Sequence, residues 1–383
     1  MNVLSLFNGM STGHTALDNV GIKVDKYYSS EIKPAAIKLT QHHYPDTIQL
    51  GDVTKWKEWD IEWSEIDMVL SGSPCQDLSI AGKRKGLKGE RSGLFFTFVD
   101  ILNHVKKYNP NVLFLQENVG SAPREDVGIM SRELGVYPVR INSSLVTAQL
   151  RDRYYWSNIR TRKDGLFGDL VTDIPQPKDR KIMFKDIVTG GAVKVGKCRA
   201  LLERNYKSFG HKDKNSEKAQ KYLKGREKFG SLSLVYVDKS TCLAERTIAS
   251  ASYKDMNSDK AQKFLKERES RSMMSLIYVD KDKHSCLTEH YKKAFDFGNE
   301  DSEKWQKYAR KRNENTGMVT LIEQKSKVRI VNKIEMCRLQ GFPDDWCDIL
   351  TDVEAGSLLG DGWTLPVIEH IFSFINKGES NAK

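Results

Sequence analysis

Hydrophobic and polar positions follow two periods along the chain, one typical of strands and one of helices. Short apolar runs that suit buried strands lie at residues 3–7, 24–29, 66–71 and 112–115. Helical spacing of apolar residues occurs up to residue 20 and over residues 95–105, 332–339 and 364–375. Strands that alternate with helices predict an α/β fold with a mostly parallel sheet.

The middle of the chain differs because it repeats itself. The segment Asn-Ser-Glu-Lys-Ala-Gln-Lys-Tyr-Leu at 215–223 recurs at 257–265 and, in a weaker form, at 301–309. Three cysteines share a spacing of 44 residues, namely Cys198, Cys242 and Cys286. Such a period is typical of stacked modules, and each unit is expected to hold a strand at the cysteine, a polar turn, a lysine-rich helix and a second strand. The alternative for each helix is a solvated amphipathic face.

Composition narrows the class of protein. Hydrophobic residues make up 39% and charged residues 29% of the chain, which is enough apolar material for a folded core. Mean hydropathy is −0.54, no apolar run approaches the length of a membrane span, and the first residues do not form a secretory signal. The six cysteines include no Cys-x-x-Cys pair, so we expect no metal site and a cytoplasmic chain with reduced thiols.

The net charge of +10 is concentrated in the middle of the chain. Residues 161–328 hold 37 Lys and Arg against 24 Asp and Glu, an excess of 13, while the rest holds 24 against 27. A localised basic excess predicts a module that binds a polyanion, inserted into a nearly neutral body. The alternative is a solvated, lysine-rich surface.

The sharpest candidate for chemistry is Gly-Ser-Pro-Cys at 72–75, where a predicted strand ends. The proline fixes the loop and presents the thiol of Cys75, a strong nucleophile once its proton has an acceptor. The basic loop at 79–93 is punctuated by glycines and suits closure over a phosphodiester. The alternative is a buried structural cysteine.

Two further motifs contain candidate residues, and the first of them lies at the end of a predicted strand. A buried glutamate at position 117 can donate a proton to a ring nitrogen, although Glu-Asn at a strand end is often only a helix cap. At extended spacing, Arg151 and Arg153 point to one face, as a fork pair for a carbonyl oxygen, a phosphate or a carboxylate. The alternative for this pair is a basic edge strand.

A cofactor site is predicted near the start of the chain. Residues 7–13 form a glycine-containing loop after the first strand, which allows close approach of a ligand. Glu31 ends the second strand, where a carboxylate can bind ribose hydroxyls, and Asp52 could accept from an adenine amino group. Recognition of ribose and adenine without a phosphate-cradling loop favours S-adenosylmethionine over a dinucleotide.

Taken in order, these motifs resemble those of the DNA cytosine-5 methyltransferases of bacteria and phages. The similarity covers residues 1–160 and 328–383. Besides the first loop, it includes Pro-Cys-Gln, Glu-Asn-Val, Gln-x-Arg-x-Arg and the segments at 338–343 and 360–368. Some segments, such as Gly-Leu-Phe-Phe at 93–96, are more similar to the animal de novo branch of the family.

The resemblance implies the Rossmann-like sheet of S-adenosylmethionine-dependent methyltransferases, with an inserted target-recognition domain. Residues 1–162 would form the first part of the catalytic domain and residues 328–383 the part that completes it. Residues 163–327 would form the recognition domain, with about three tandem repeats. We expect the repeats to be consecutive elements that each read a different site; the alternative is a duplication that only lengthens the DNA contact.

The resemblance also implies residue roles. Cys75 would add to C6 of a flipped cytosine, Glu117 would protonate or hydrogen-bond N3 and the amino group, and Arg153, helped by Arg151, would hold O2. The residues implied in cofactor binding are Phe7, Gly9, Thr12, Glu31, Asp52, Pro74 and Trp363.

Two departures from the family pattern bear on the cofactor. Ser11 replaces a frequent glycine and Asp361 a frequent asparagine, and we expect either change to weaken cofactor binding.

Other functions fit these motifs less well. A regulatory relative that binds DNA without chemistry is disfavoured by the intact Cys75, Glu117 and Arg153. A tRNA methyltransferase of the same fold is disfavoured by the long repeated segment, and the Pro-Pro-Tyr motif of amino-methylating enzymes is absent. The expected partner is double-stranded DNA, without a membrane. We expect a monomer in the cytoplasm of a bacterial or phage-infected cell, associated with the nucleoid. A cognate restriction endonuclease is a candidate partner.

Overall fold

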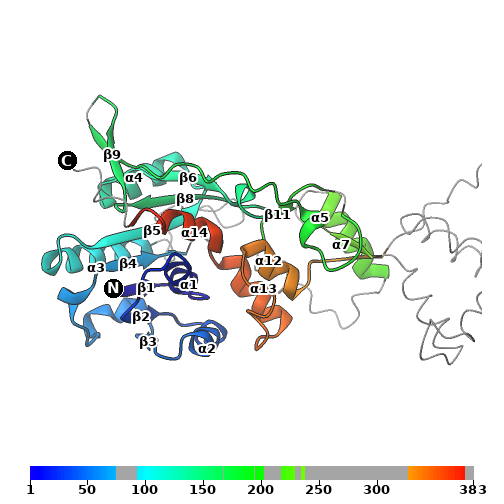
Figure 1. The fold of residues 1–383 in the computed structure, drawn as a ribbon, viewed down its shortest axis with the longest axis horizontal. Helices are drawn as coiled ribbons and strands as arrows, with labels where there is room; N and C mark the ends of the chain where they lie inside the picture. Colours follow the sequence, from blue (N-terminus) through cyan, green and yellow to red (C-terminus); the bar gives the residue numbers. More distant parts are fainter. Residues whose placement is uncertain are drawn as a thin grey trace, which may run out of the picture.

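The computed structural model describes residues 1–74, 93–166, 168–193, 195–201, 217–228, 234–237 and 327–375. At its centre lies a seven-stranded sheet of order β3-β2-β1-β4-β5-β8-β6 (Figure 1). The strands are β1 Asn2–Leu6, β2 Lys26–Ser30, β3 Ile48–Gln49, β4 Met68–Ser71, β5 Leu113–Val119, β6 Val139–Asn142 and β8 Asp152–Ser157. The first five are parallel, and β8 runs antiparallel to both β5 and β6. The prediction of a mostly parallel α/β sheet is confirmed.

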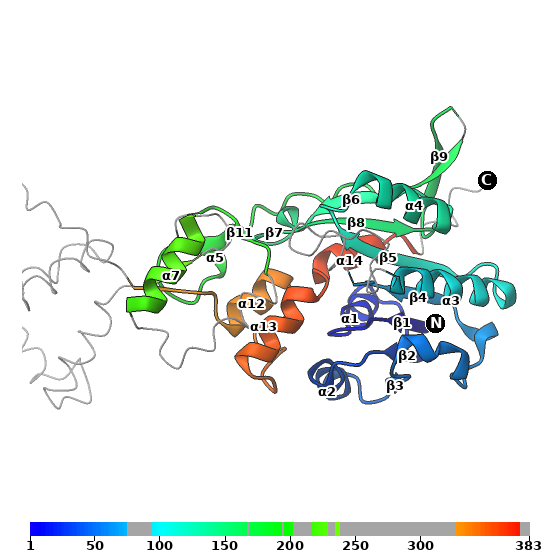
Figure 2. The same cartoon turned by 180° about the vertical axis from the view of Figure 1, so that it is seen from behind.

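Helices cover both faces of this sheet (Figures 1 and 2). Outside the predicted insert, the helices of eight or more residues are α1 Thr12–Asn19, α2 Pro34–His43, α3 Leu94–Tyr108, α4 Arg124–Leu134, α12 Lys333–Gln340, α13 Asp352–Asp361 and α14 Leu365–Phe372. Helices α1 and α14 pack against each other and share one core cluster, whereas α3 and α4 contribute to the cluster on the other face. The expected helices near residues 95, 332 and 364 are therefore present.

Burial on both faces explains the continuous apolar runs of the central strands. In β1, Val3 packs into the cluster that contains α1, while Leu4 and Leu6 pack into the cluster that contains α3. Strand β4 alternates in the same way. Each fully buried apolar side chain contributes roughly 1.5–3 kcal/mol to the stability of the fold. Because helices cover both faces of the sheet, the central strands have no face that must be polar.

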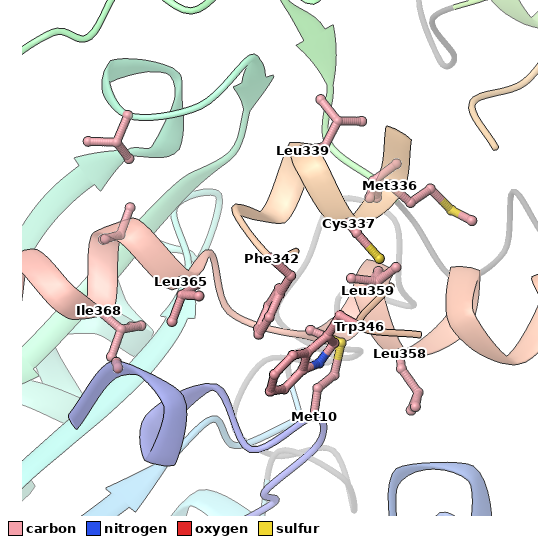
Figure 3. Close-up of a cluster of buried hydrophobic side chains, with 14 of the residues drawn as sticks. Met10, Met336, Cys337, Leu339, Phe342, Trp346, Leu358, Leu359, Leu365 and Ile368 are labelled. Carbon is pink, nitrogen blue, oxygen red and sulfur yellow. The ribbon is translucent and has the colours of Figure 1, made fainter. Parts of the chain in front are cut away.

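The carboxyl-terminal helices complete the core that the first loop begins. Figure 3 shows Met10, which precedes α1, among buried side chains of α12, α13, α14 and their connections. The labelled partners are Met336, Cys337, Leu339, Phe342, Trp346, Leu358, Leu359, Leu365 and Ile368. The two ends of the chain therefore form one hydrophobic core.

The segment between these ends begins on the body. Short strand β11, Cys198–Arg199, pairs in parallel with β7, Gln149–Leu150, and the side chain of Cys198 is buried in the core. Helix α5, Phe184–Ile187, buries both its apolar ends in the same cluster. Part of the segment assigned to the insert thus contacts the catalytic body, and the domain boundaries stay a prediction.

The first repeated unit contains a helix and a strand where they were expected. Helix α7 spans Glu217–Lys228 and strand β12 spans Val235–Val237. Strand β12 pairs antiparallel with β13, Lys327–Arg329, so that Val237 lies opposite Lys327. The second and third units, with Cys242 and Cys286, lie outside the described residues.

The base of the insert is tied to α12 by the carboxylate of Glu335, whose side chain is 0% exposed. It accepts hydrogen bonds from Arg329 Nη1 at 2.6 Å and Nη2 at 2.7 Å, from the Thr189 amide at 2.8 Å and from the Asn332 amide at 2.9 Å. Burial raises the pKa of Glu335, but these donors outweigh burial and hold the pKa below its usual value.

Replacing Glu335 by Gln should lower the free energy of unfolding by about 3 kcal/mol, because the variant leaves the Arg329 guanidinium without its charge partner. Urea unfolding followed by circular dichroism measures this loss. Since the pKa of Glu335 is depressed in the fold, the difference from wild type should be full at neutral pH and should shrink as the pH falls through that pKa. Glu354→Gln, at the same capping position of helix α13, is the control and should cost less, because its capping hydrogen bonds are exposed to solvent. Equal losses in both variants would contradict the assignment.

Candidate functional site

The carboxyl ends of the parallel strands open into a cavity of about 620 Å³. Its walls come from the loop after β1, the loop after β2, the end of β4, strand β5 and residues 360–363 near the carboxyl terminus. This is where open α/β sheets bind ligands. All the described residues that were candidates for catalysis or cofactor binding line it: Phe7, Gly9, Thr12, Glu31, Asp52, Pro74, Glu117, Arg151, Arg153 and Trp363.

The loop after β1 turns sharply to approach the cavity. Phe7, Gly9 and Ser11 all have left-handed backbones, with φ of 57°, 60° and 58°. Glycine adopts this conformation freely, whereas a serine does so at a cost. The Ser11 hydroxyl offsets the cost by bonding to Thr40 Oγ1 at 2.8 Å and by accepting from Asn8 Nδ2 at 2.8 Å.

Glu31 is held in place by backbone amides. Its Oε2 accepts from the Gly9 amide at 2.8 Å, and its Oε1 accepts from the amides of Ile32 at 2.8 Å and Lys33 at 2.9 Å. These bonds join the loops that follow β1 and β2. They fix the carboxylate at the cavity, where its remaining lone pairs can accept from hydroxyl groups.

Asp52 caps the short 3₁₀ helix η1, Val53–Glu58. Its Oδ1 accepts from the Thr54 amide and from the Thr54 hydroxyl, both at 2.9 Å. The hydrogen bond from the Thr54 amide and, to a lesser extent, the one from the Thr54 hydroxyl hold the pKa of Asp52 below its usual value, so the carboxyl group is ionised at neutral pH. Within the described part of the chain Oδ2 has no hydrogen-bond partner, which suits it to an amino group.

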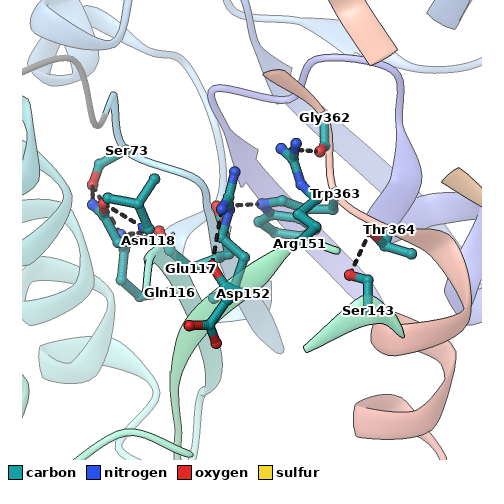
Figure 4. A network of polar contacts seen from close by, with 12 residues as sticks. Ser73, Gln116, Glu117, Asn118, Ser143, Arg151, Asp152, Gly362, Trp363 and Thr364 are labelled. Carbon is teal, nitrogen blue, oxygen red and sulfur yellow. Dashed lines mark hydrogen bonds and ion pairs between the residues drawn. The ribbon is translucent and has the colours of Figure 1, made fainter. Parts of the chain in front are cut away.

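The polar centre of the cavity is the carboxylate of Glu117 (Figure 4). Arg153 Nε lies 2.7 Å from Oε1, and the indole Nε1 of Trp363 donates to Oε2 at 3.1 Å. Glu117 was expected where β5 stops, but the strand continues to Val119 because β8 pairs with it. In that register Glu117 lies opposite Tyr155 and Arg153 opposite Val119, a diagonal that long side chains can span.

Arg151 and Arg153 bind different partners. The Arg151 guanidinium is 2% exposed and donates to the carbonyl oxygens of Gly360 at 3.0 Å and Gly362 at 2.8 Å. Arg153 uses Nε for Glu117 and Nη1 for the carbonyl of Asp152. Among the described residues, Arg153 Nη2 has no acceptor. The structure thus brings both guanidinium groups to the cavity but does not make them a fork pair.

The turn that leads to Pro74 is also fixed. The Ser73 hydroxyl accepts from Gln116 Nε2 at 2.8 Å and from Asn118 Nδ2 at 3.4 Å, which ties the end of β4 to β5 (Figure 4). Gly72 lies against the indole of Trp363, since a Cβ at this glycine would stand 2.8 Å from Trp363 Nε1. A glycine is therefore required for the indole to reach Glu117.

Among the residues of the cavity that were not predicted to bind the cofactor, three stand out by their exposure or charge. Ile32 is 69% exposed and lines the cavity beside Glu31. Lys33 Nζ forms an ion pair with Asp361 Oδ2 at 2.6 Å across the rim. The aspartate that departs from the family pattern therefore has a cationic partner. An exposed apolar residue directly after Glu31 was the available signal for Ile32, but no local signal links Lys33 to Asp361.

Cys75 and most of the loop at 79–93 lie outside the described residues. The described chain reaches Pro74, the residue before Cys75 in the sequence, and Pro74 lines the cavity. Among the described residues, no group of three or more His, Cys, Asp or Glu side chains could hold a metal ion. Nor do those residues form a helix long and apolar enough to cross a membrane.

The cavity fits S-adenosylmethionine in its size and in the polar and apolar groups that line it. Its volume falls within the range of about 300–1,000 Å³ that is usual for small-molecule sites. The ionised Asp52 and the anchored Glu31 supply acceptors for an amino group and for hydroxyls, and Ile32 supplies an apolar surface.

The fold and the cavity define a protein with the α/β fold of S-adenosylmethionine-dependent methyltransferases. A family model described as C-5 cytosine-specific DNA methylase matches residues 1–377, and the chain belongs to this family. The resemblance found in the motifs is thereby confirmed.

Curated relatives come from phages and bacteria. An orphan methyltransferase of Bacillus phage SPR, M.SPRI, is 31% identical over 236 residues, which are 58% of this chain and 49% of the phage protein. A type II methyltransferase of Neisseria gonorrhoeae, M.NgoBV, is 34% identical over 136 residues, which are 34% of this chain and 31% of that protein. The matched region thus spans half or less of each of these relatives.

Two solved structures show the same fold. The Entamoeba histolytica methyltransferase EhMeth is 11% identical, with a TM-score of 0.54 and coverage of 98% of both chains. The S. pombe Dnmt2 methyltransferase is 14% identical, with a TM-score of 0.50 and coverage of 100% of this chain and 99% of its own.

Replacing Gly72 by Ala should displace the Trp363 indole, because the added Cβ would stand 2.8 Å from Nε1. We expect a loss of about 1–3 kcal/mol in unfolding free energy, together with weaker binding of S-adenosylmethionine in calorimetry. Gly190→Ala is the matched control, since nothing lies within 4 Å of its Cβ position. An unfolding midpoint for Gly72→Ala as high as that of the control would show that the contact does not constrain the site.

Proposed function

We propose that the chain is a DNA cytosine-5 methyltransferase that transfers a methyl group from S-adenosylmethionine to C5 of a flipped cytosine in duplex DNA. The observation that carries the proposal is the cluster of Glu117, Arg153 and Trp363 on the wall of the cofactor cavity that Pro74 also lines. It puts a carboxylate and a guanidinium on the same cavity as the residue that precedes Cys75. Family membership supports the same reaction.

Each of these groups has a role in activating the base. The Cys75 thiolate forms a bond from sulfur to C6, and the electrons of the C5–C6 double bond move toward C5 while Glu117 gives a proton to N3. Arg153 donates to O2 through Nη2, the nitrogen that its contacts with Glu117 and Asp152 leave available. Bound S-adenosylmethionine supplies an electrophilic methyl group for C5.

The second half of the reaction restores the aromatic base. A base removes the C5 proton, the C5–C6 double bond forms again and the thiolate leaves C6, while the N3 proton returns. Arg151 supports this chemistry indirectly, because its guanidinium holds the carbonyls of Gly360 and Gly362 and so the wall that carries Trp363.

The substrate must offer both a polyanion and a base that leaves its stack. A thiol cannot reach C6 inside a stacked duplex, so the cytosine is flipped into the cavity. The excess of 13 positive charges over residues 161–328 supplies the cations that grip phosphates. We assign DNA recognition to residues 163–327, and we propose a monomer that acts in the cytoplasm at the nucleoid, with a cognate restriction endonuclease as an optional partner.

Replacing Cys75 by Ser should abolish methyl transfer, because a hydroxyl is a far weaker nucleophile than a thiolate. Tritiated S-adenosylmethionine and duplex DNA measure the transfer. A duplex that contains 5-fluorocytosine should trap a covalent adduct with wild type and none with Cys75→Ser, since fluorine cannot leave C5 as a proton does. Cys198→Ala, which removes a buried thiol from β11, should still form the adduct. Full activity of Cys75→Ser would overturn the mechanism, and transfer to tRNA but not to duplex DNA would replace the DNA substrate.

Deleting one repeated unit should remove methylation at one target sequence and retain it at others, because each unit is proposed to read its own site. Bisulfite sequencing of DNA from cells that express each deletion reads this out. An equal fall of methylation at every target would show instead that the repeats only lengthen the contact with DNA.

A further inference from the structure

The hydrogen bond between Trp363 and Glu117 joins the two halves of the body at the reacting base. Its donor lies in the carboxyl-terminal segment and its acceptor in β5, 246 positions apart in the sequence. The indole N–H only donates, and it meets Oε2, while Arg153 meets Oε1. Each carboxylate oxygen therefore has one donor, and together the two donors define the plane of the carboxylate.

The indole itself has little freedom to move. On one side it lies against the backbone of Gly72. The next residue in the sequence, Thr364, donates to Gln340 Oε1 at 2.8 Å in buried surroundings. It also accepts from the buried Ser143 hydroxyl at 2.9 Å (Figure 4). The preceding carbonyl, of Gly362, accepts from Arg151. Trp363 is thus held from both flanking residues.

This placement gives one side chain two surfaces. The ring of Trp363 lines the cavity, and its N–H faces the carboxylate that would meet the base. We propose that Trp363 is a positioning residue: it orients Glu117 for cytosine and transmits filling of the cofactor cavity to that carboxylate. The identity of the base rests on the proposed function, whereas the link between Trp363 and Glu117 does not.

The link can be tested without turnover. In a ¹H–¹⁵N spectrum of the full chain, which has seven tryptophans, the Trp363 indole resonance is the one that disappears in Trp363→Phe. Glu117→Gln should move that resonance more than the other six, because it removes the charge from the acceptor. Addition of S-adenosylhomocysteine to wild type should also move it. A Trp363 resonance that ignores Glu117→Gln would overturn the proposal.

Kinetics then separate positioning from cofactor binding. Trp363→Phe keeps an aromatic wall but removes the N–H, so we expect kcat to fall about 10-fold, the worth of a hydrogen bond to a charged group, with little change in the Kd for S-adenosylmethionine. Adduct formation with 5-fluorocytosine should slow by a similar factor. A Kd that rises while kcat stays at the wild-type value would assign Trp363 to the cavity wall alone and overturn the positioning role.

The matched control is Trp346→Phe. This indole N–H is buried and has no acceptor among the described residues, so the same substitution removes no hydrogen bond there. It should leave kcat and the Trp363 resonance close to wild type, and an equal fall of kcat would point to a general packing effect and against the proposal. If wild type methylates no DNA but the resonance responds to Glu117→Gln, the proposed function fails and the link between the two residues stands.

Discussion

A buried guanidinium needs hydrogen-bond acceptors in place of water. Arg151 donates to two backbone carbonyl oxygens of the carboxyl-terminal segment. Without those carbonyls the charge would be stranded in the interior, so the segment at 360–362 is held where the β7–β8 connection requires it. Two features of the far cavity wall lie next to these carbonyls in the sequence: the indole that reaches Glu117, and Asp361 on the rim opposite Lys33. The hydrophobic core brings the two ends of the chain together, and the hydrogen bonds of Arg151 fix the position of the cavity wall.

The strands and helices of the body could largely be foreseen, because their signals are local. Val3 and Leu4 belong to opposite core clusters, so a continuous apolar run correctly indicated a strand buried on both faces. The extension of β5 through Gln116, Glu117 and Asn118 could not be foreseen, since polar residues continue as a strand only when a distant partner pairs with them. That partner is β8, and its register is a property of the folded sheet.

The site was foreseen in its membership more than in its contacts. Parallel strands place their carboxyl ends together, and so Glu31, Asp52 and Glu117 were expected at one edge of the sheet. Which atoms meet there depends on side-chain packing. The spacing of Arg151 and Arg153 in an extended chain suggested that they act as a pair, yet Arg151 binds carbonyls and Arg153 binds a carboxylate. The requirement for glycine at position 72 likewise exists only once the Trp363 indole lies against it.

The antiparallel pairing of β12 with β13 has a consequence for how this chain can change over generations. Residues 237 and 327 lie opposite each other in this strand pair, which we call the neck, so residues 238–326 are joined to the described chain at two neighbouring positions. Any whole number of repeated units can be spliced in beyond that neck without altering the distance its two strands must span. Duplication of a unit can thus lengthen the segment proposed to read DNA without changing the residues that line the cavity.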